Sequence, residues 1–276
     1  MTGKRAEATM HSGELTFVVP AYGESSHLEH CLQSLSRQTS GARIILTTST
    51  PSAFLTSLAS RFGYPLIVNP RKAGIASDWS FAYSNAGTRY VTLAHQDDVY
   101  APDYAARCVA AADRHPDSLV VFTDAAELLD GRSRLQSRTL TVKRTIVWLF
   151  FARSEAIRSL RMKQRLISLG NPISCPTVLY NRANIGDFTF SEGWSYNLDW
   201  DAWQRLAELD GSFVYVKQPL VSHRIHEESA LVRGTTDNSR GIEDRRMFRR
   251  FWPKPVALLL AGLYAMSYDV SRASTP

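Results

Sequence analysis

Two adjacent carboxylates, Asp97 and Asp98, end an apolar run in the segment "YVTLAHQDDVYAPDY" of residues 90–104. Neighbouring like charges repel each other unless a positive group lies beside them. Divalent cations such as Mg²⁺ and Mn²⁺ prefer oxygen ligands and often bind substrate phosphates. A metal here would therefore let the chain hold a diphosphate. The alternative is a solvated turn in which Asp98 or Asp103 caps the following helix, and the spacing alone does not separate the two.

A second acidic pair, Asp199 and Asp201, opens a predicted helix in the segment "LDWD". Carboxylates are common in a first helical turn because the helix dipole favours anions there. The functional alternative is a general base held on a rigid element. Trp194, Trp200 and Trp203 are close in sequence, and they either belong to the core or form an apolar wall beside that base.

Two histidines, His223 and His226, follow a predicted strand in the segment "HRIHEES". They have neither the spacing of a zinc HExxH motif nor a cysteine partner. A histidine in such a position is usually structural. The pair therefore indicates chemistry only in combination with the two acidic clusters.

The elements that would position these residues alternate regularly in the first half of the chain. We predict strands over residues 15–22, 42–48, 65–69, 90–95 and 118–124, and helices over 25–38, 51–63, 75–87 and 101–115. Such alternation favours a parallel sheet covered by helices on both faces. Ligands bind such sheets outside the carboxyl ends of the strands, which is where Asp97 and Asp98 fall. The chain has no GxGxxG after its first strand and no Walker loop.

The second half is less regular. Residues 124–170 are polar and basic around the patch "IVWLFF", and we predict them to be helical. A strand over 173–181, a helix over 195–211 that ends at Gly211, and a strand over 212–216 follow.

Composition sets limits on the class of protein. The chain has 276 residues, of which 44% are hydrophobic and 21% charged, so it can form one large α/β domain with or without a small appendage. Cys31, Cys108 and Cys175 are widely spaced and favour neither disulfides nor a zinc site. The first residues contain no apolar signal region. We therefore expect a reducing compartment, the cytoplasm.

The net charge is +6, and much of the excess comes late, in "RSEAIRSLRMKQR" and "DRRMFRR". An apolar run over residues 256–266 follows the second of these and is too short to cross a bilayer, which needs ~20 residues. It is either a buried helix or an interfacial anchor. A basic segment before an apolar one fits peripheral contact with an anionic membrane, at the inner face of the plasma membrane. No recognisable DNA- or RNA-binding motif is present, so nucleic acid is not an expected partner.

Four blocks, in order, resemble family 2 glycosyltransferases. They are "FVVPAYGESSHLEHCLQSLSRQT", "GIASDWSFAYSNAGTRYVTLAHQDDVYAPDY", "ISCPTVLYNRANIGDF" followed by "LDWDAWQRLAE", and "VYVKQPLVSHRIHEESA". Together they cover roughly residues 14–232. An ordered set of this kind is much more specific than any single motif.

The resemblance implies a GT-A fold: a Rossmann-like, mostly parallel α/β sheet flanked by helices, here with a helical C-terminal extension. It implies a flexible N-terminus over residues 1–13 and a glycosyltransferase domain over 14–235. Within that domain, 14–124 would form the nucleotide-sugar half and 125–235 the acceptor half. Residues 236–276 would form the basic and apolar extension.

The family's functional residues carry over by position. The resemblance implies that the nucleotide-diphosphate sugar contacts Pro20, Tyr22, Glu24, Thr48, Asp78, Gln96 and Asp97. It assigns Mn²⁺ or Mg²⁺ to Asp97, Asp98 and His226. Asp199 falls on the catalytic base, with Asp201 as the second choice.

The chain departs from the family pattern at three places. His95 stands at the first acid of the D-x-D motif, Thr48 stands where an aspartate usually ends the second strand, and Leu198 replaces the glutamate of an E-D pair. Because of these changes, the family pattern does not fix which nucleotide this chain binds or how many ligands its metal has.

We therefore expect a metal-dependent inverting transferase that acts on a saccharide or lipid-linked glycan acceptor in cell-surface glycan biosynthesis. The alternative is a non-catalytic protein of the same fold that only binds a nucleotide sugar. A glycoside hydrolase also uses two carboxylates, but adjacent aspartates at one strand end suit a metal better than two acids that flank a bond.

Overall fold

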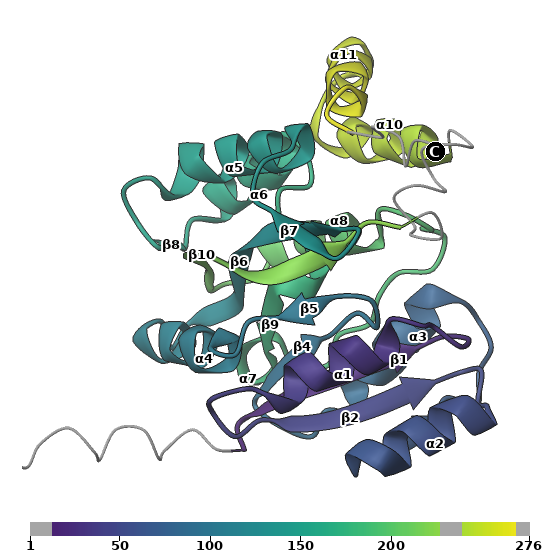
Figure 1. Ribbon diagram of the computed structural model, residues 1–276. Helices are drawn as coiled ribbons and strands as arrows, with labels where there is room; N and C mark the ends of the chain where they lie inside the picture. The colour runs from purple at the N-terminus through teal and green to yellow at the C-terminus, as the bar shows by residue number, and fades with distance from the viewer. Residues whose placement is uncertain (1–12, 227–238, 269–276) are drawn as a thin grey trace, which may run out of the picture.

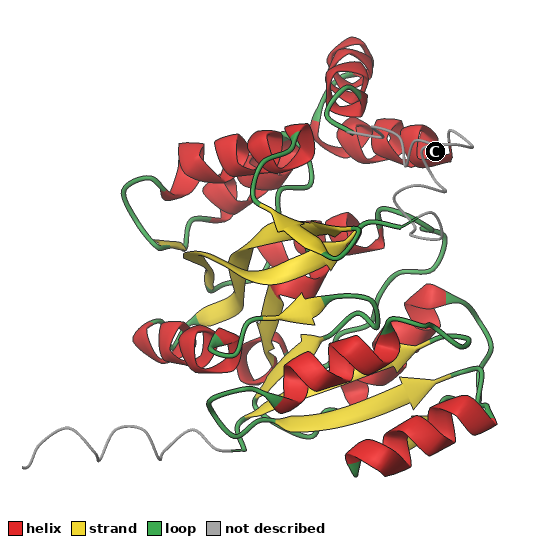
Figure 2. Ribbon diagram, in the orientation of Figure 1, coloured by secondary structure: helices red, strands yellow, loops and turns green. Residues whose placement is uncertain are grey.

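The computed structural model describes residues 13–226 and 239–268. Helices surround a central twisted sheet (Figures 1 and 2), so the expected α/β class is confirmed. Of the flexible N-terminus expected over residues 1–13, residues 1–12 lie outside the described part of the chain. The predicted boundary at residue 235 also lies outside it, as do residues 269–276.

The N-terminal half folds as the alternation predicts. Its first four strands pair in parallel in the order β3-β2-β1-β4. The strands are β1 (Leu15–Ala21), β2 (Arg43–Thr48), β3 (Leu66–Val68) and β4 (Tyr90–Leu93). The helices are α1 (Leu28–Ser36), α2 (Ala53–Phe62), α3 (Ile75–Ser84) and α4 (Tyr104–Arg114). Consecutive strands therefore bring their carboxyl ends to one edge of the sheet.

The sheet becomes mixed beyond β4. The next strand in sequence, β6 (Ser118–Leu129), does not pair with β4, because β9 (Val178–Asn181) lies between them and is antiparallel to both. β10 (Ser212–Arg224) then pairs in parallel with β6. Both β6 and β10 are longer than predicted. Pro219, which has no N–H to donate, falls at an irregularity of the β10–β6 ladder, where the missing bond is tolerated.

Three short strands were not predicted: β5 (Val99–Tyr100), β7 (Arg132–Arg134) and β8 (Ala156–Ile157). Two or three residues are too few to show an alternating pattern. Each of these strands is formed by pairing with a long neighbour, β5 and β8 with β10 and β7 with β6.

The remaining helices cover the second half. They are α5 (Arg138–Phe151), α6 (Leu160–Ser168), the short α7 (Arg182–Ile185), α8 (Leu198–Ala207), α10 (Ser239–Phe251) and α11 (Lys254–Ala265). A 3-10 turn, Cys175–Thr177, precedes β9. The helical C-terminal extension is therefore present.

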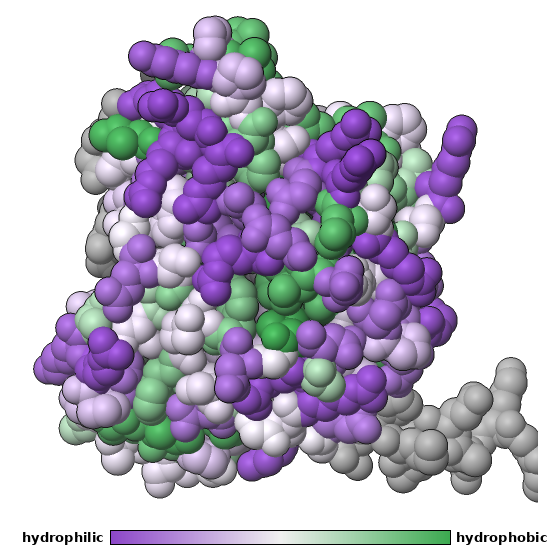
Figure 3. Space-filling view, turned by 180° about the vertical axis from the view of Figure 1, so that it is seen from behind, coloured by the Kyte–Doolittle hydropathy of each residue, from purple (hydrophilic) through white to green (hydrophobic). Residues whose placement is uncertain are grey.

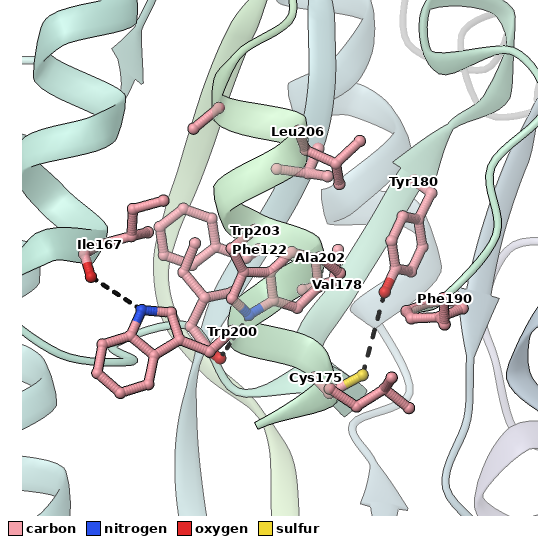
Figure 4. Packing of buried hydrophobic residues seen from close by; sticks show 14 of the residues in the cluster. Phe122, Ile167, Cys175, Val178, Tyr180, Phe190, Trp200, Ala202, Trp203 and Leu206 are labelled. Carbon is pink, nitrogen blue, oxygen red and sulfur yellow. Dashed lines mark hydrogen bonds between the residues drawn. The ribbon is translucent and has the colours of Figure 1, made fainter. Parts of the chain in front are cut away.

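Helix α8 is anchored by two tryptophans (Figure 4). Trp200 and Trp203 are fully buried, and their indole N–H groups donate to the carbonyls of Ile167 at 2.9 Å and Ile173 at 3.2 Å. Both side chains belong to the core, as does Trp194 at 4% exposed, and none of the three lines the cleft described below. The ring of each indole is buried and its N–H is hydrogen-bonded, so the start of α8 is held in a fixed position.

The C-terminal extension packs on the domain. Phe248 of α10 is fully buried with its ring edge-on to Trp200 at 5.0 Å, and the Trp252 indole donates to the carbonyl of Ser168. The hydroxyl of Tyr264 on α11 accepts from the backbone N–H of Asn171. None of the helices in the described ranges combines the length and apolarity required to cross a membrane.

Gly211, between α8 and β10, provides a test of the packing against the start of β6. Its φ is +124°, and a Cβ atom there would lie 2.6 Å from the carbonyl oxygen of Asp117. We expect Gly211→Ala to lower the free energy of unfolding by about 2–4 kcal/mol, because strain and overlap add. Gly63→Ala is the matched control, since Gly63 has a φ of +70° but open space around its Cβ position; it should cost about 1 kcal/mol. Equal losses in urea unfolding would contradict this account.

Candidate functional site

A cleft of about 700 Å³ opens at the carboxyl ends of the strands. Its wall includes the loop after β1, the first turns of α3, the loop after β4, and residues 195–196 before α8. Six of the seven residues predicted to bind the donor line it: Pro20, Tyr22, Glu24, Asp78, Gln96 and Asp97. These residues are far apart in sequence, and the shared edge of a parallel sheet brings them together.

Thr48 is the exception among the seven. It is buried at the end of β2, with 3% of its surface exposed, and it does not line the cleft. Its hydroxyl accepts from the backbone N–H of Thr50, and the Thr50 hydroxyl accepts from the N–H of Gly23 at 2.8 Å. Thr48 thus supports the loop after β1 from behind.

Asp78 and Gln96 are engaged with neighbouring segments. The Asp78 carboxylate accepts from the hydroxyl of Ser49 and the amide of Asn69, both at 2.9 Å. The Gln96 side chain accepts from the backbone N–H of Tyr22 and donates to its carbonyl. This double contact fixes the Tyr22 backbone while its ring stays 65% exposed at the cleft.

Asp97 lies at the cleft beside His226 and Arg224. Its carboxylate is 3.0 Å from Nε2 of His226, and its carbonyl accepts from Nε of Arg224 at 2.9 Å. Burial opposes ionisation, but the hydrogen bond from His226 and the nearby histidines lower the pKa of Asp97 to about 2. The two residues that the resemblance assigned to a metal are therefore in contact.

Asp98 lies deeper and is fully buried. Its carboxylate accepts from the backbone N–H of Arg224 at 2.9 Å and lies 3.0 Å from Nδ1 of His223. Asp98 does not cap the next helix, because that position belongs to Asp103, which makes no capping bond either. His223, taken from sequence as part of a weak signal, is the partner of a buried carboxylate.

His95 completes a group with the two aspartates. Each of His95, Asp97 and Asp98 offers one potential ligand atom, and these three atoms lie within 4.8 Å of one another. Nε2 of His95 is buried without a hydrogen-bond partner. Burial lowers the pKa of His95, although Asp98 and Asp97 oppose the shift, and a neutral imidazole is the form that binds metals. Two carboxylates and one neutral imidazole with a free nitrogen fit a divalent cation.

The two acids of α8 have different surroundings. Asp199 is half-buried and near enough to His95 for its charge to act on that group. Asp201 is 2% exposed and pairs with Arg250 of α10 at 2.6 Å. Asp201 is therefore engaged in holding the C-terminal extension. Asp199 stands at the start of α8, where its carboxylate accepts from the backbone N–H of Trp200 at 2.8 Å, and it is not among the residues that line the cleft.

Comparison with known proteins identifies the family. The model of glycosyl transferase family 2 matches residues 16–184. The chain belongs to this family of glycosyltransferases. No curated protein matches the sequence.

Solved structures of glycosyltransferases share the fold. The S. aureus TarS fragment 1–349 in complex with UDP-GlcNAc superposes with a TM-score of 0.62 at 14% identity, over 95% of this chain and 74% of that one. The mannosyltransferase PcManGT from Pyrobaculum calidifontis, in complex with GDP-Man and Mn²⁺, gives a TM-score of 0.59 at 13% identity, over 95% and 76%. The GT-A fold expected from the sequence is therefore confirmed.

Two residues near the site of this glycosyltransferase were not predicted. Lys143 of α5 donates to the hydroxyl of Ser174 at 2.8 Å. Burial lowers its pKa to about 8, and the charge of Asp199 opposes the shift. It stands in a basic, irregular stretch, and no sequence signal separates it from the lysines and arginines around it.

The second is Glu243 of α10. Its carboxylate accepts from three successive backbone N–H groups, those of Ser195 at 2.7 Å and of Tyr196 and Asn197 at 2.9 Å. Ser195 and Tyr196 line the cleft, and Asn197 precedes α8. The C-terminal extension thus holds the loop that leads to Asp199.

Glu243→Gln tests this contact, because an amide cannot accept three hydrogen bonds through one oxygen. We expect the free energy of unfolding to fall by about 1–3 kcal/mol and the KM for substrates to rise as the loop loosens. Glu192→Gln, an exposed glutamate in the same loop, is the control. Thermal unfolding and initial rates measure both effects. If the two variants behaved alike, the loop would not depend on Glu243.

Proposed function

We propose that this glycosyltransferase moves a sugar, with inversion, from a nucleotide-diphosphate donor to an acceptor hydroxyl in a metal-dependent reaction. The observation that carries the proposal is the cleft in which six expected donor-binding residues meet the carboxylates of the loop after β4. The solved structures of the same fold contain UDP-GlcNAc or GDP-Man with Mn²⁺. The donor of this chain would belong to the same chemical class.

The donor would lie along the cleft with its diphosphate toward Asp97. The loop after β1 and the start of α3 would surround the nucleotide, with Asp78 and the exposed Tyr22 at the wall. His95, Asp97 and Asp98 would hold Mn²⁺ or Mg²⁺, with His226 supporting Asp97. When bound, such an ion offsets the negative charge of the departing diphosphate.

Asp199 would act as the general base. It would take the proton of the acceptor hydroxyl as that oxygen attacks the anomeric carbon, on the face opposite the diphosphate. The bond to the diphosphate breaks, and its electron pair leaves with the phosphate oxygen.

The reaction would serve the synthesis of a cell-surface glycan, with a saccharide or lipid-linked acceptor. We place it at the cytoplasmic face of the plasma membrane, with the C-terminal extension as the contact. Removal of residues 240–276 would not test this placement, since Glu243 and Phe248 are part of the folded domain. Substitutions on the exposed surface of the extension are the appropriate test.

The metal site is tested by binding. With Mn²⁺ and a nucleoside diphosphate, the melting temperature of the native chain should rise, by an amount equivalent to about 2.7 kcal/mol at a hundred times the Kd. Asp97→Asn should lose the Mn²⁺-dependent part of that rise. Asp103→Asn, a surface aspartate paired with Arg107, should retain it. Full transfer activity in excess chelator would exclude the metal.

The base is tested by turnover. Asp199→Asn should lower kcat by ~10²–10⁴-fold and leave the donor Kd nearly unchanged. Asp201→Asn should instead lower stability, because it leaves Arg250 without its carboxylate partner. Sugar transfer by the purified protein, measured with saturating donor, gives the rates. Full activity of Asp199→Asn would show that the assignment is wrong, and tight donor binding without any turnover would favour a non-catalytic binding protein.

A further inference from the structure

Helices α5 and α11 expose an unusual amount of apolar side chain. Trp148 is 65% exposed and its neighbour Leu149 56%, both on α5. On and just after α11, Leu259 is 64% exposed, Leu263 57% and Met266 71%. Single apolar residues are normal on a protein surface, whereas a set gathered on neighbouring helices is the kind that marks an interaction site.

The two helices form one surface. The hydroxyl of Thr139 near the start of α5 donates to the carbonyl of Ser267 just after α11 at 2.8 Å. A groove of about 570 Å³ runs between them and is lined by Arg138 and Thr141 on one side and by Leu263 and Met266 on the other. We call this surface the α5–α11 face. In Figure 1, α11 projects at the top of the molecule, away from the nucleotide half.

This face is basic as well as apolar. Helices α5, α6 and α11 contain no aspartate or glutamate. The exposed cations of α5 and α11 are Arg138 and Lys254, and the neighbouring helix α6 adds Arg161 and Arg165. Seen from behind in Figure 3, strongly hydrophilic and hydrophobic residues lie next to each other at the top of the molecule.

The positive charge of the α5–α11 face indicates which kind of partner it binds. A second copy of the chain would bring the same cations face to face across a twofold interface, which repels. An anionic lipid surface attracts them, and the apolar side chains gain by entering the boundary between headgroups and acyl chains. Tryptophan is also the side chain most suited to that boundary, since it is apolar with one polar N–H.

We propose that the α5–α11 face docks on an anionic membrane surface and so presents the acceptor side of the cleft to a lipid-linked acceptor. Helix α5 connects the two roles: Trp148 and Leu149 face solvent, while Lys143 reaches Ser174 on the side of Asp199. Docking is independent of chemistry, but the lipid-linked acceptor rests on the function proposed above.

Vesicle sedimentation with the full chain tests the docking. The native protein should bind phosphatidylcholine vesicles that contain phosphatidylglycerol, bind pure phosphatidylcholine vesicles much less, and lose binding as salt rises. The double variants Trp148→Ser with Leu149→Ser, and Leu259→Ser with Leu263→Ser, should each bind at least about ten-fold more weakly. Phe54→Ser on α2 is the control, because Phe54 is an exposed apolar residue at the other end of the molecule (Figure 1).

Three results would overturn the proposal. They are no binding to acidic vesicles, unchanged binding by both double variants, and a dimer in light scattering that the same substitutions dissociate, which would assign the face to self-association. Donor turnover in vesicle-free solution separates the two proposals. The double variants should lose docking but keep normal turnover. If the native protein bound vesicles but showed no turnover, the transferase function alone would be refuted.

Discussion

Two neighbouring carboxylates, one at the cleft and one fully buried, can lie at the end of β4 because another strand supplies their partners. Burial of an unpaired charge costs several kcal/mol, and Asp98 is fully buried. The partners come from the end of β10, where the backbone N–H of Arg224 and the ring of His223 meet Asp98 and His226 meets Asp97. The length of β10, its bulges around Pro219 and its pairing with β6 are therefore requirements of the site.

The same edge of the sheet organises the rest of the cleft through indirect contacts. Gln96 fixes the backbone of Tyr22, and Thr48 acts through Thr50 on Gly23. Each contact joins the end of one strand to the loop after another. The cleft is thus a set of mutually braced loops, and its exposed side chains are free to meet a substrate because the backbone beneath them is held.

The C-terminal extension belongs to this arrangement. Through Glu243 it holds the loop before α8, and through Arg250 it neutralises Asp201. Its other helix turns apolar side chains to solvent in company with α5. One segment thereby links the cleft to the apolar and basic α5–α11 face, which gives a physical reason for treating the two as parts of one function.

The amino-acid pattern alone predicted the alternating first half and the edge at which ligands bind, because strand and helix periods are local and parallel strands end together. It did not reveal that β9 separates β4 from β6, since strand pairing depends on contacts far apart in the sequence. The individual cleft residues came from the resemblance to the family. That resemblance also placed Thr48 at the donor, but whether a side chain at a strand end faces the cleft depends on neighbouring loops. It treated His95 as a missing acid, and only the fold shows a buried imidazole nitrogen without a partner beside two aspartates. Glu243 lies 46–48 residues from the N–H groups it accepts, and a contact across that separation leaves no local signal because it exists only once α10 has packed against α8.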